Sequence, residues 1–493
     1  MSGARRDGER KRGKPGMQAR PVSAGPTVTQ AEAIAKISPA RAAAFEILTL
    51  VAADKGHSDE LLHSPRTDVL GPEDRNLTTA LVMGVLRWQI ALDTHLRRLL
   101  ARPDQRLAEP VALALRMGAF QLLHMDRIPA HAVLNESVEM CRSAGQPHAA
   151  GMVNAVLRKL AVEQSTSQNR DAGHPLHEST EAFAERLGHP LWLVQRWVAA
   201  YGGEAALAIC EYDQHEPGRG AIFPEADGTA ANSDGEGVPQ MDDGSRLVAE
   251  LAAAAAPVST PSARIWDCCA APGGKTLMLA RRLTTAEILA TDISAKRIAR
   301  MAARLRRYAS AQRVRCAVAD ASDAGPEVSQ DAKFDLILCD VPCSGTGTLA
   351  RNPEIRLRLR PDELARQSAR QRAILSGALR RLAPGGRLLY STCSLEPEEN
   401  ELVVEAVATK AGVRRLSMEL LIARLTEMGV FRQDVGARLI DTAVKDGALR
   451  TLPGVHGCDG FFAVLLERGP HAADDTEANL PFAKLTKDRT PGS

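Results

Sequence analysis

The strongest constraint on the fold is a change of pattern near residue 263, after which short apolar runs alternate with longer amphipathic segments. The apolar runs have strand length; they are Arg264–Asp267, Ile288–Asp292, Val314–Asp320, Phe334–Asp340 and Arg387–Cys393, with a late one at Gly460–Glu467. The amphipathic segments have helical spacing; they are Lys275–Leu283, Ala295–Tyr308, Asp362–Leu382 and Glu398–Ala408. This alternation predicts a mostly parallel sheet with helices on both faces.

The preceding part of the chain, residues 38–162, shows helical spacing only. Apolar residues recur every three or four positions in Arg41–Ala53, Val111–His124 and Gly151–Leu160. The alternation that is typical of strands is absent from this sequence. We therefore predict an all-α domain, built as a compact helical bundle.

Polar and turn-rich stretches divide the rest of the chain. Residues 1–20 carry seven Lys and Arg against two acidic residues and almost no apolar side chains, so burial cannot offset the entropy of ordering them. Helices are predicted over Leu191–Tyr201 and Glu204–Tyr212. The expected parts are a disordered basic tail (1–37), the helical domain (38–162), a linker (163–180), a helical subdomain ending in a flexible loop (181–245), the α/β domain (246–470) and a disordered tail (471–493).

Composition excludes several classes of protein. The net charge of +2 does not by itself indicate a nucleic-acid partner. No apolar stretch follows the basic start, and no run of about 18 apolar residues is present, so we expect a cytoplasmic protein with no membrane partner. None of the nine cysteines has CxxC spacing, which favours reduced thiols and no metal site.

A glycine-containing turn joins the first predicted strand to its helix. Two glycines let the backbone approach a ligand closely, and the following helix offers free N–H groups. The turn lies at the carboxyl end of the strand, where open α/β sheets bind ligands, although such a turn alone is as often only a tight turn. The residues of the turn are Cys269, Ala270, Ala271, Pro272, Gly273, Gly274 and Lys275.

Two further acidic residues end strands. Asp292 ends the second strand and can accept hydrogen bonds from ribose hydroxyls, and Asp320 ends the third and can accept from an adenine amino group. A single aspartate at a strand end is more often a helix cap. Two of them in register with the glycine turn favour a nucleoside-containing cofactor.

Two cysteines lie at the ends of two later strands. Cys343 follows Asp340 by three residues, and Cys393 lies just upstream of a helix that Pro397 is predicted to open, a position that favours a thiolate. Either cysteine alone would more often be a buried structural residue. Their shared place beside the predicted cofactor turn favours a chemical role.

Methylation of cytosine at C5 needs parts of this kind, because C5 is a poor nucleophile until a thiolate adds to C6. The reaction then calls for an acid that contacts the ring and for help with elimination. Cys393, Asp340 and Cys343 can fill these three roles in that order. The base must also leave its stack to be reached.

Three motifs, CCAAPGGKT, DVPCSGTGTLARNPEIR and YSTCSLEPEEN, resemble those of the Sun-type RNA cytosine-5 methyltransferases. The N-terminal segments RAAAF, GVLRW and NAVLR resemble the RNA-binding fold of the antitermination factor NusB. The resemblance implies a multidomain protein: an all-α NusB-like helical bundle followed by an α/β Rossmann-like S-adenosylmethionine-dependent methyltransferase domain.

The resemblance also implies roles for the motif residues. Cys269 through Lys275 surround the methionine part of S-adenosylmethionine, Asp292 holds the ribose and Asp320 the adenine, and Asp340 lies beside both cofactor and base. Cys393 matches the nucleophile of the family, and Cys343 matches the cysteine implicated in product release.

The same arrangement of domains occurs in methyltransferases of small-subunit ribosomal RNA, so the resemblance implies 16S ribosomal RNA as the partner. Transfer RNA or 23S ribosomal RNA remains an alternative, as does a non-catalytic ribosome-assembly factor. We expect a monomer. Residues 212–223 differ from the usual family pattern, which leaves the RNA contacts made there open.

Several arginines follow the Cys343 motif. They could bind phosphates or be ordinary surface residues; they are Arg351, Arg356, Arg358, Arg360, Arg366, Arg370 and Arg372.

Overall fold

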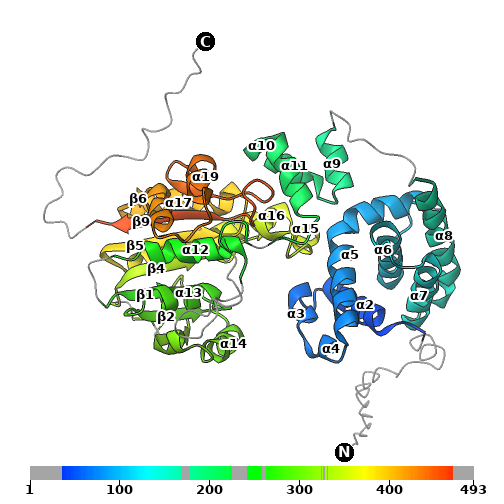
Figure 1. Ribbon diagram of the computed structural model, residues 1–493, viewed down its shortest axis with the longest axis horizontal. Coiled ribbons are helices and arrows are strands. Elements are labelled where there is room, and N and C mark those ends of the chain that lie inside the picture. Colours follow the sequence, from blue (N-terminus) through cyan, green and yellow to red (C-terminus); the bar gives the residue numbers. More distant parts are fainter. Residues whose placement is uncertain are drawn as a thin grey trace, which may run out of the picture.

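The computed structural model places a helical bundle beside an α/β domain, with three short helices lying against both (Figure 1). The structure describes residues 36–167, 178–218, 220–224, 241–257, 262–323, 325, 328–329 and 331–469. The two predicted tails and most of the predicted linker and loop lie outside these described residues.

The N-terminal bundle confirms the prediction of an all-α domain. A single apolar core holds it together, with Ile47, Leu81, Leu115 and Val153 all fully buried. Its helices are α2 (Pro39–Ala52), α3 (Ser58–Leu62), α4 (Pro65–Asp68), α5 (Pro72–Leu99), α6 (Glu109–His124), α7 (Ala130–Ser143) and α8 (Ala150–Ser167). The last of these continues five residues into the segment predicted as a linker, since it ends at 167 rather than 162.

Three short helices connect the bundle to the α/β domain: α9 (Thr180–Arg186), α10 (Leu191–Tyr201) and α11 (Gly203–Tyr212). Their buried residues, Trp197 among them, pack against Leu349 and Leu395 of the α/β domain. The predicted loop ends sooner than expected, because α12 (Asp243–Ala254) begins within it. Asp242 caps α12 by accepting a hydrogen bond from the Ser245 N–H.

The α/β domain contains one sheet in the order β3-β2-β1-β4-β5-β9-β8-β7, with β6 also paired to β9. Strands β3, β2, β1, β4 and β5 pair in parallel, as predicted, and β6 to β9 pair antiparallel. Their bounds are β1 (Arg264–Asp267), β2 (Glu287–Asp292), β3 (Val314–Val318), β4 (Phe334–Asp340), β5 (Leu382–Thr392), β6 (Val413–Leu416), β7 (Val444–Lys445), β8 (Ala448–Arg450) and β9 (Phe462–Arg468).

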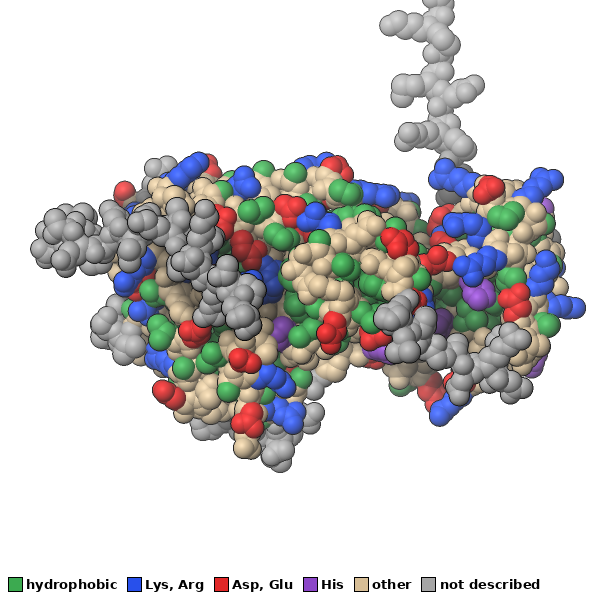
Figure 2. All heavy atoms as spheres, turned by 90° about the horizontal axis from the view of Figure 1, so that it is seen from above, with side chains coloured by type: hydrophobic (Ala, Val, Ile, Leu, Met, Phe, Trp, Pro, Cys, Tyr) green, Lys and Arg blue, Asp and Glu red, His purple; other side chains and the backbone are tan. Residues whose placement is uncertain are grey.

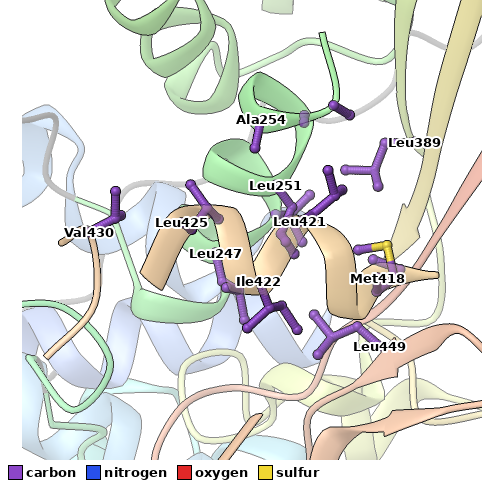
Figure 3. Packing of buried hydrophobic residues seen from close by; sticks show 14 of the residues in the cluster. Leu247, Leu251, Ala254, Leu389, Met418, Leu421, Ile422, Leu425, Val430 and Leu449 are labelled. Carbon is purple, nitrogen blue, oxygen red and sulfur yellow. The ribbon is translucent and has the colours of Figure 1, made fainter. Parts of the chain in front are cut away.

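Helices cover both faces of the sheet because successive side chains of a strand point to opposite faces. In β4, for example, Leu338 packs in the cluster that contains α12, whereas Ile337 packs in the cluster that contains α16. Figure 3 shows α12 packed against α18, with Leu247 and Leu251 close to Leu421 and Ile422. The helices are α13 (Gly274–Arg282), α14 (Ala295–Leu305), α15 (Ile355–Arg358), α16 (Pro361–Arg380), α17 (Glu401–Ala411), α18 (Met418–Glu427) and α19 (Val435–Ala443).

The segment after Cys393 differs from its prediction. Pro397–Glu399 form one short 3₁₀ turn, called η4, and α17 begins only at Glu401. Cys393 therefore does not lie directly before the N-terminus of an α-helix, and the structure provides no helix dipole that would favour a thiolate there. Proline favours the first turn of a 3₁₀-helix as well as that of an α-helix. Pro397 therefore marks the start of the short η4 turn and not the start of α17.

Buried polar contacts join the bundle to the α/β domain. The backbone N–H and hydroxyl of Ser58 in α3 donate to the Glu354 carboxylate at 3.0 and 2.9 Å. Arg356, which is only 2% exposed, donates to the backbone carbonyls of Arg87, Gly188 and Asp213, one from the bundle and two from the connecting helices. Among the helices that the structure describes, none is both long and apolar enough to cross a membrane.

Candidate active site

The predicted site residues other than Asp292 and Asp320 gather at the carboxyl ends of three neighbouring parallel strands. β1 ends at Asp267, β4 at Asp340 and β5 at Thr392, and β4 pairs with both of the others. Asp340 lies opposite Ser391 in the register, so the segments that carry Cys343 and Cys393 leave the sheet side by side. Parallel strands bring sequence-distant ends to one edge, which is where such sheets bind ligands.

The glycine turn forms one wall of a pocket of about 180 Å³. Gly273 has a φ of +97°, a conformation that side chains other than hydrogen rarely allow, and α13 begins at the next residue. Of the predicted cofactor residues, those that line the pocket are Cys269, Ala270, Ala271, Pro272, Gly274, Lys275 and Asp340. Met241, Asp242 and Ser245, from the start of α12, line its other side.

An ion pair between Lys275 and Asp340 crosses this pocket. The Lys275 Nζ lies 2.8 Å from the Asp340 Oδ2, and the Ser391 hydroxyl donates to the Asp340 Oδ1 at 2.7 Å. Burial lowers the pKa of Lys275, but the Asp340 carboxylate more than offsets this and the pKa is raised overall. Lys275 therefore stays charged, and the pair offers one cationic and one anionic group to a ligand.

Asp267 is a site residue whose role the sequence did not predict. Its carboxyl is buried, accepts a hydrogen bond from the Thr276 hydroxyl at 2.6 Å and lines the same pocket. Burial raises its pKa to about 7. The one available signal was its place as the last polar residue of a strand beside the glycine turn.

Asp292 ends β2 as expected, whereas Asp320 lies two residues beyond the end of β3 at Val318, and neither residue lines this pocket. The Asp292 carboxylate accepts from the Ser294 N–H and pairs with Arg297 at 3.0 Å. Asp320 is exposed and accepts from the backbone N–H and hydroxyl of Ser322. These contacts are those of local turns, so a part in cofactor binding stays a prediction for both residues.

The two predicted catalytic cysteines meet, with Cys343 Sγ 3.4 Å from Cys393 Sγ. The contact with Cys393 and then burial raise the pKa of Cys343 well above its ordinary value. Cys269, the thiol nearest the glycine turn, also has a strongly raised pKa, first because of its contact with Cys268 and then because of burial. Cys343 and Cys269 therefore hold their protons at neutral pH. The nucleophile role of Cys393 stays a prediction.

A groove of about 760 Å³ leads from Cys343 to the N-terminal bundle. Leu48 and Val51 of α2, Gln89 of α5 and Arg116 of α6 line its far wall. The near wall includes Cys343, Ser344, Glu354, Ile355 and the segment 357–360. A molecule that reaches the cysteines through this groove contacts both domains.

Most of the arginines after Cys343 form ion pairs or hydrogen bonds within the protein, so they do not form one shared phosphate-binding site. Arg351 pairs with Asp459, Arg356 is buried, and Arg358 donates to the Val51 and Gly56 carbonyls. Arg366 pairs with two acidic residues of its own helix, whereas Arg360, Arg370 and Arg372 are exposed. Over the face that Figure 2 displays, basic and acidic side chains of the described residues are interspersed rather than gathered into one basic patch.

No group of three or more metal-ligating side chains is found within the part of the chain that the structure describes. The site combines two thiols in contact, an ion-paired carboxylate and a glycine-turn pocket. They suit covalent addition to an electron-poor ring and transfer of a group from a bound cofactor.

Comparison with known proteins adds independent findings. Residues 256–467 match the family model of the 16S rRNA methyltransferases RsmB/F, and residues 38–162 match that of the NusB family. Ribosomal RNA small subunit methyltransferase B of Xanthomonas campestris pv. campestris is 34% identical over 473 residues, covering 88% of this chain and 98% of that protein. The probable counterpart of Bacillus subtilis is 30% identical, covering 87% and 98%. The crystal structure of PH0851 shares the fold, with a TM-score of 0.64 at 21% identity over 88% of this chain and 99% of the other.

Proposed function

This chain belongs to the RsmB/F family of 16S rRNA methyltransferases, and we propose that its Cys393 is the nucleophile that activates a cytosine of 16S ribosomal RNA for methylation at C5. Family membership makes it an S-adenosylmethionine-dependent rRNA cytosine methyltransferase. The observation that carries the assignment of roles is the contact between Cys343 and Cys393 beside the Lys275–Asp340 pair.

The reaction runs in three stages at this site. The Cys393 thiolate adds to C6 of the cytosine, and the electron pair displaced from the C5–C6 double bond makes C5 nucleophilic. Asp340 contacts the ring at N3 and the amino group, and a proton carried by its carboxyl group passes to N3 and neutralises the negative charge that develops there. After methylation, the C5 proton is removed, the C6–sulfur bond breaks, and its electron pair returns to Cys393 while the ring double bond reforms. Cys343, in contact with that sulfur, assists this elimination.

The residues of the glycine-turn pocket fit the cofactor that this chemistry needs. S-adenosylmethionine supplies an electrophilic methyl group when it is bound. The turn N–H groups and Lys275 suit its carboxylate, and Asp340 suits its ammonium group. Asp292 and Asp320 are proposed to hold the ribose and the adenine, as the family motifs imply.

The RNA enters along the groove between the domains. The groove reaches Cys343 and continues over α2 and α6 of the NusB-like bundle, so RNA flanking the unstacked cytosine lies against that bundle. This is the reason to expect the bundle to take part in choosing the target.

The test is methyl transfer from labelled S-adenosylmethionine to deproteinised 16S RNA, 23S RNA, transfer RNA and small-subunit particles, each offered separately. We expect label at one 16S cytosine, whether in free RNA or in particles, and none with Cys393→Ala, whose cofactor affinity stays close to that of the unaltered protein. Cys316→Ala, a substitution on β3 away from the cysteine pair, is the matched control and retains transfer.

Cys343→Ala separates the two cysteines. It is expected to accumulate a covalent protein–RNA adduct, visible as a shifted band in a denaturing gel. Turnover by Cys393→Ala would remove the nucleophile role, and free turnover by Cys343→Ala without an adduct would contradict the release role. Label in another RNA alone would keep the mechanism and overturn the substrate, whereas cofactor binding with no label in any substrate would favour an assembly factor.

A further inference from the structure

One buried carboxylate, that of Glu399, lies behind both cysteines. It belongs to η4 and is fully buried. Its Oε1 accepts from the Ser344 backbone N–H at 2.8 Å, and its Oε2 accepts from the hydroxyls of Ser344 and Ser394. Ser344 follows Cys343 and Ser394 follows Cys393, so a single side chain holds the residue after each thiol.

Further contacts make this link between the two cysteine segments rigid. Gln371 of α16 donates both to the Glu399 Oε1 at 3.0 Å and to the Pro342 carbonyl at 2.9 Å. The Tyr390 hydroxyl donates to the Glu399 backbone carbonyl at 2.6 Å. The carboxylate is thus fixed from α16 and both cysteine segments, and the Glu399 backbone is fixed from β5. None of the ion pairs found among the described residues involves Glu399, so donors alone satisfy it.

The chemistry of these donors requires a carboxylate. Four hydrogen bonds arrive, two at each oxygen, and a carboxylate accepts at both. Glutamine has nearly the same shape, but its NH₂ group cannot accept a hydrogen bond. In one orientation the NH₂ group would face the fixed Ser344 N–H, and in the other it would face the hydroxyls of Ser344 and Ser394, which donate to Glu399 in the unaltered protein. Substitution by glutamine therefore loosens the link without emptying the site.

We propose that Glu399 is a positioning residue that keeps Cys343 in register with Cys393 for the elimination step. The inference rests on the roles proposed above for the two cysteines. Addition to C6 needs Cys393 alone, whereas release needs both thiols at the 3.4 Å separation. Loss of the carboxylate therefore slows release more than it slows addition and methyl transfer, a selectivity that a purely structural role would not produce.

The experiment compares the rate of methyl incorporation with the rate of adduct decay in a single turnover of Glu399→Gln on 16S RNA. We expect adduct decay to slow by about ten- to a hundredfold, as misplacement of a reacting group by up to 1 Å does, while methyl incorporation changes about threefold or less. Ser344→Ala, which removes one donor and keeps the carboxylate, is expected to show the same selectivity more weakly. It also provides the measurement if Glu399→Gln fails to fold.

The matched control is Glu396→Gln, a buried glutamate three residues away whose partners are Arg196 and the Trp197 indole N–H. It should lower stability and leave the ratio of the two rates unchanged. Equal loss of both rates in Glu399→Gln, or decay as fast as in the unaltered protein, would overturn the positioning role. Either result leaves the nucleophile assignment standing if Cys393→Ala is inactive; turnover by Cys393→Ala would instead remove the premise.

Discussion

Replacing Gly347 by alanine should destabilise the protein through a steric clash alone. Gly347 is buried, and an added Cβ would lie 2.2 Å from the Gly460 carbonyl oxygen. Carbon and oxygen atoms in such contacts stay about 3.3 Å apart, so the two backbones must separate by about 1 Å. The Gly460 N–H donates to the Gly347 carbonyl at 2.7 Å, and that hydrogen bond would stretch beyond its useful range.

The magnitude follows from these two losses. Overpacking costs about 1–3 kcal/mol, and a broken buried hydrogen bond with an unsatisfied partner adds about 1–3 kcal/mol. We therefore expect Gly347→Ala to lower the free energy of unfolding by about 2–6 kcal/mol and the urea midpoint by about 1 M or more. Because the Gly347 N–H also donates to the Cys393 carbonyl at 2.9 Å, single-turnover methyl transfer should fall as well.

The assay is urea denaturation followed by circular dichroism, with Gly151→Ala as the control. Gly151 is exposed on α8, and no atom lies within 4 Å of a Cβ added there. Alanine at that position should stabilise the helix by about 0.5–1 kcal/mol. A Gly347→Ala protein with a midpoint equal to or above that of the unaltered protein would refute the steric argument.

Two further predictions concern buried polar groups. Ser58→Ala removes a hydroxyl donor to the buried Glu354 carboxylate, and this hydrogen bond is worth about 1.5–3 kcal/mol. Backbone hydrogen exchange in α3 should therefore accelerate about ten- to a hundredfold. The control Ser143→Ala, in α7, should leave the exchange in α3 unchanged. The pKa of Asp267 in the folded state is raised to about 7, so the folded state keeps a proton that the unfolded state loses near pH 4. The protonated carboxyl group stabilises the folded state at low pH, and this stabilisation is lost as the pH rises from about 4 to about 7. The stability of cofactor-free Asp267→Asn relative to the unaltered protein should therefore increase from pH 5 to pH 7.5 by about 2–3 kcal/mol; a constant difference would contradict the raised pKa.

The sequence predicted the parts of the fold that have a long repeating pattern. β1 ends at Asp267 and β4 at Asp340, as expected, because each strand has several apolar residues followed by a polar one. β7 and β8 have two and three residues, too few for an alternation to be visible, and neither strand was predicted. α18 and α19 lie between β6 and β7 and were not predicted either.

The site was predictable where local motifs decide it and not where tertiary contacts do. The adjacency of Cys343 and Cys393 follows from two strand ends that pair in parallel, and the 3.4 Å contact confirms it. Arg356, however, lies in the sequence among several other arginines, and nothing there distinguishes it from them. It is buried, and not available to a phosphate, because the segments around Arg87, Gly188 and Asp213 pack around it. Glu399 was likewise predicted only to open a helix.

The burial of Arg356 bears on whether the domains of this protein can be separated or exchanged. Its pKa is lowered to about 10 by burial, so the guanidinium is still charged at neutral pH and depends on carbonyls supplied by the other two parts of the chain. A catalytic fragment that begins at α12 would lack all three acceptors. A chimera with a foreign N-terminal domain would need a carbonyl in the place of that of Arg87. The domains therefore cannot be exchanged independently. A chimera that keeps the α/β domain must also keep the backbone carbonyls that accept hydrogen bonds from the Arg356 guanidinium.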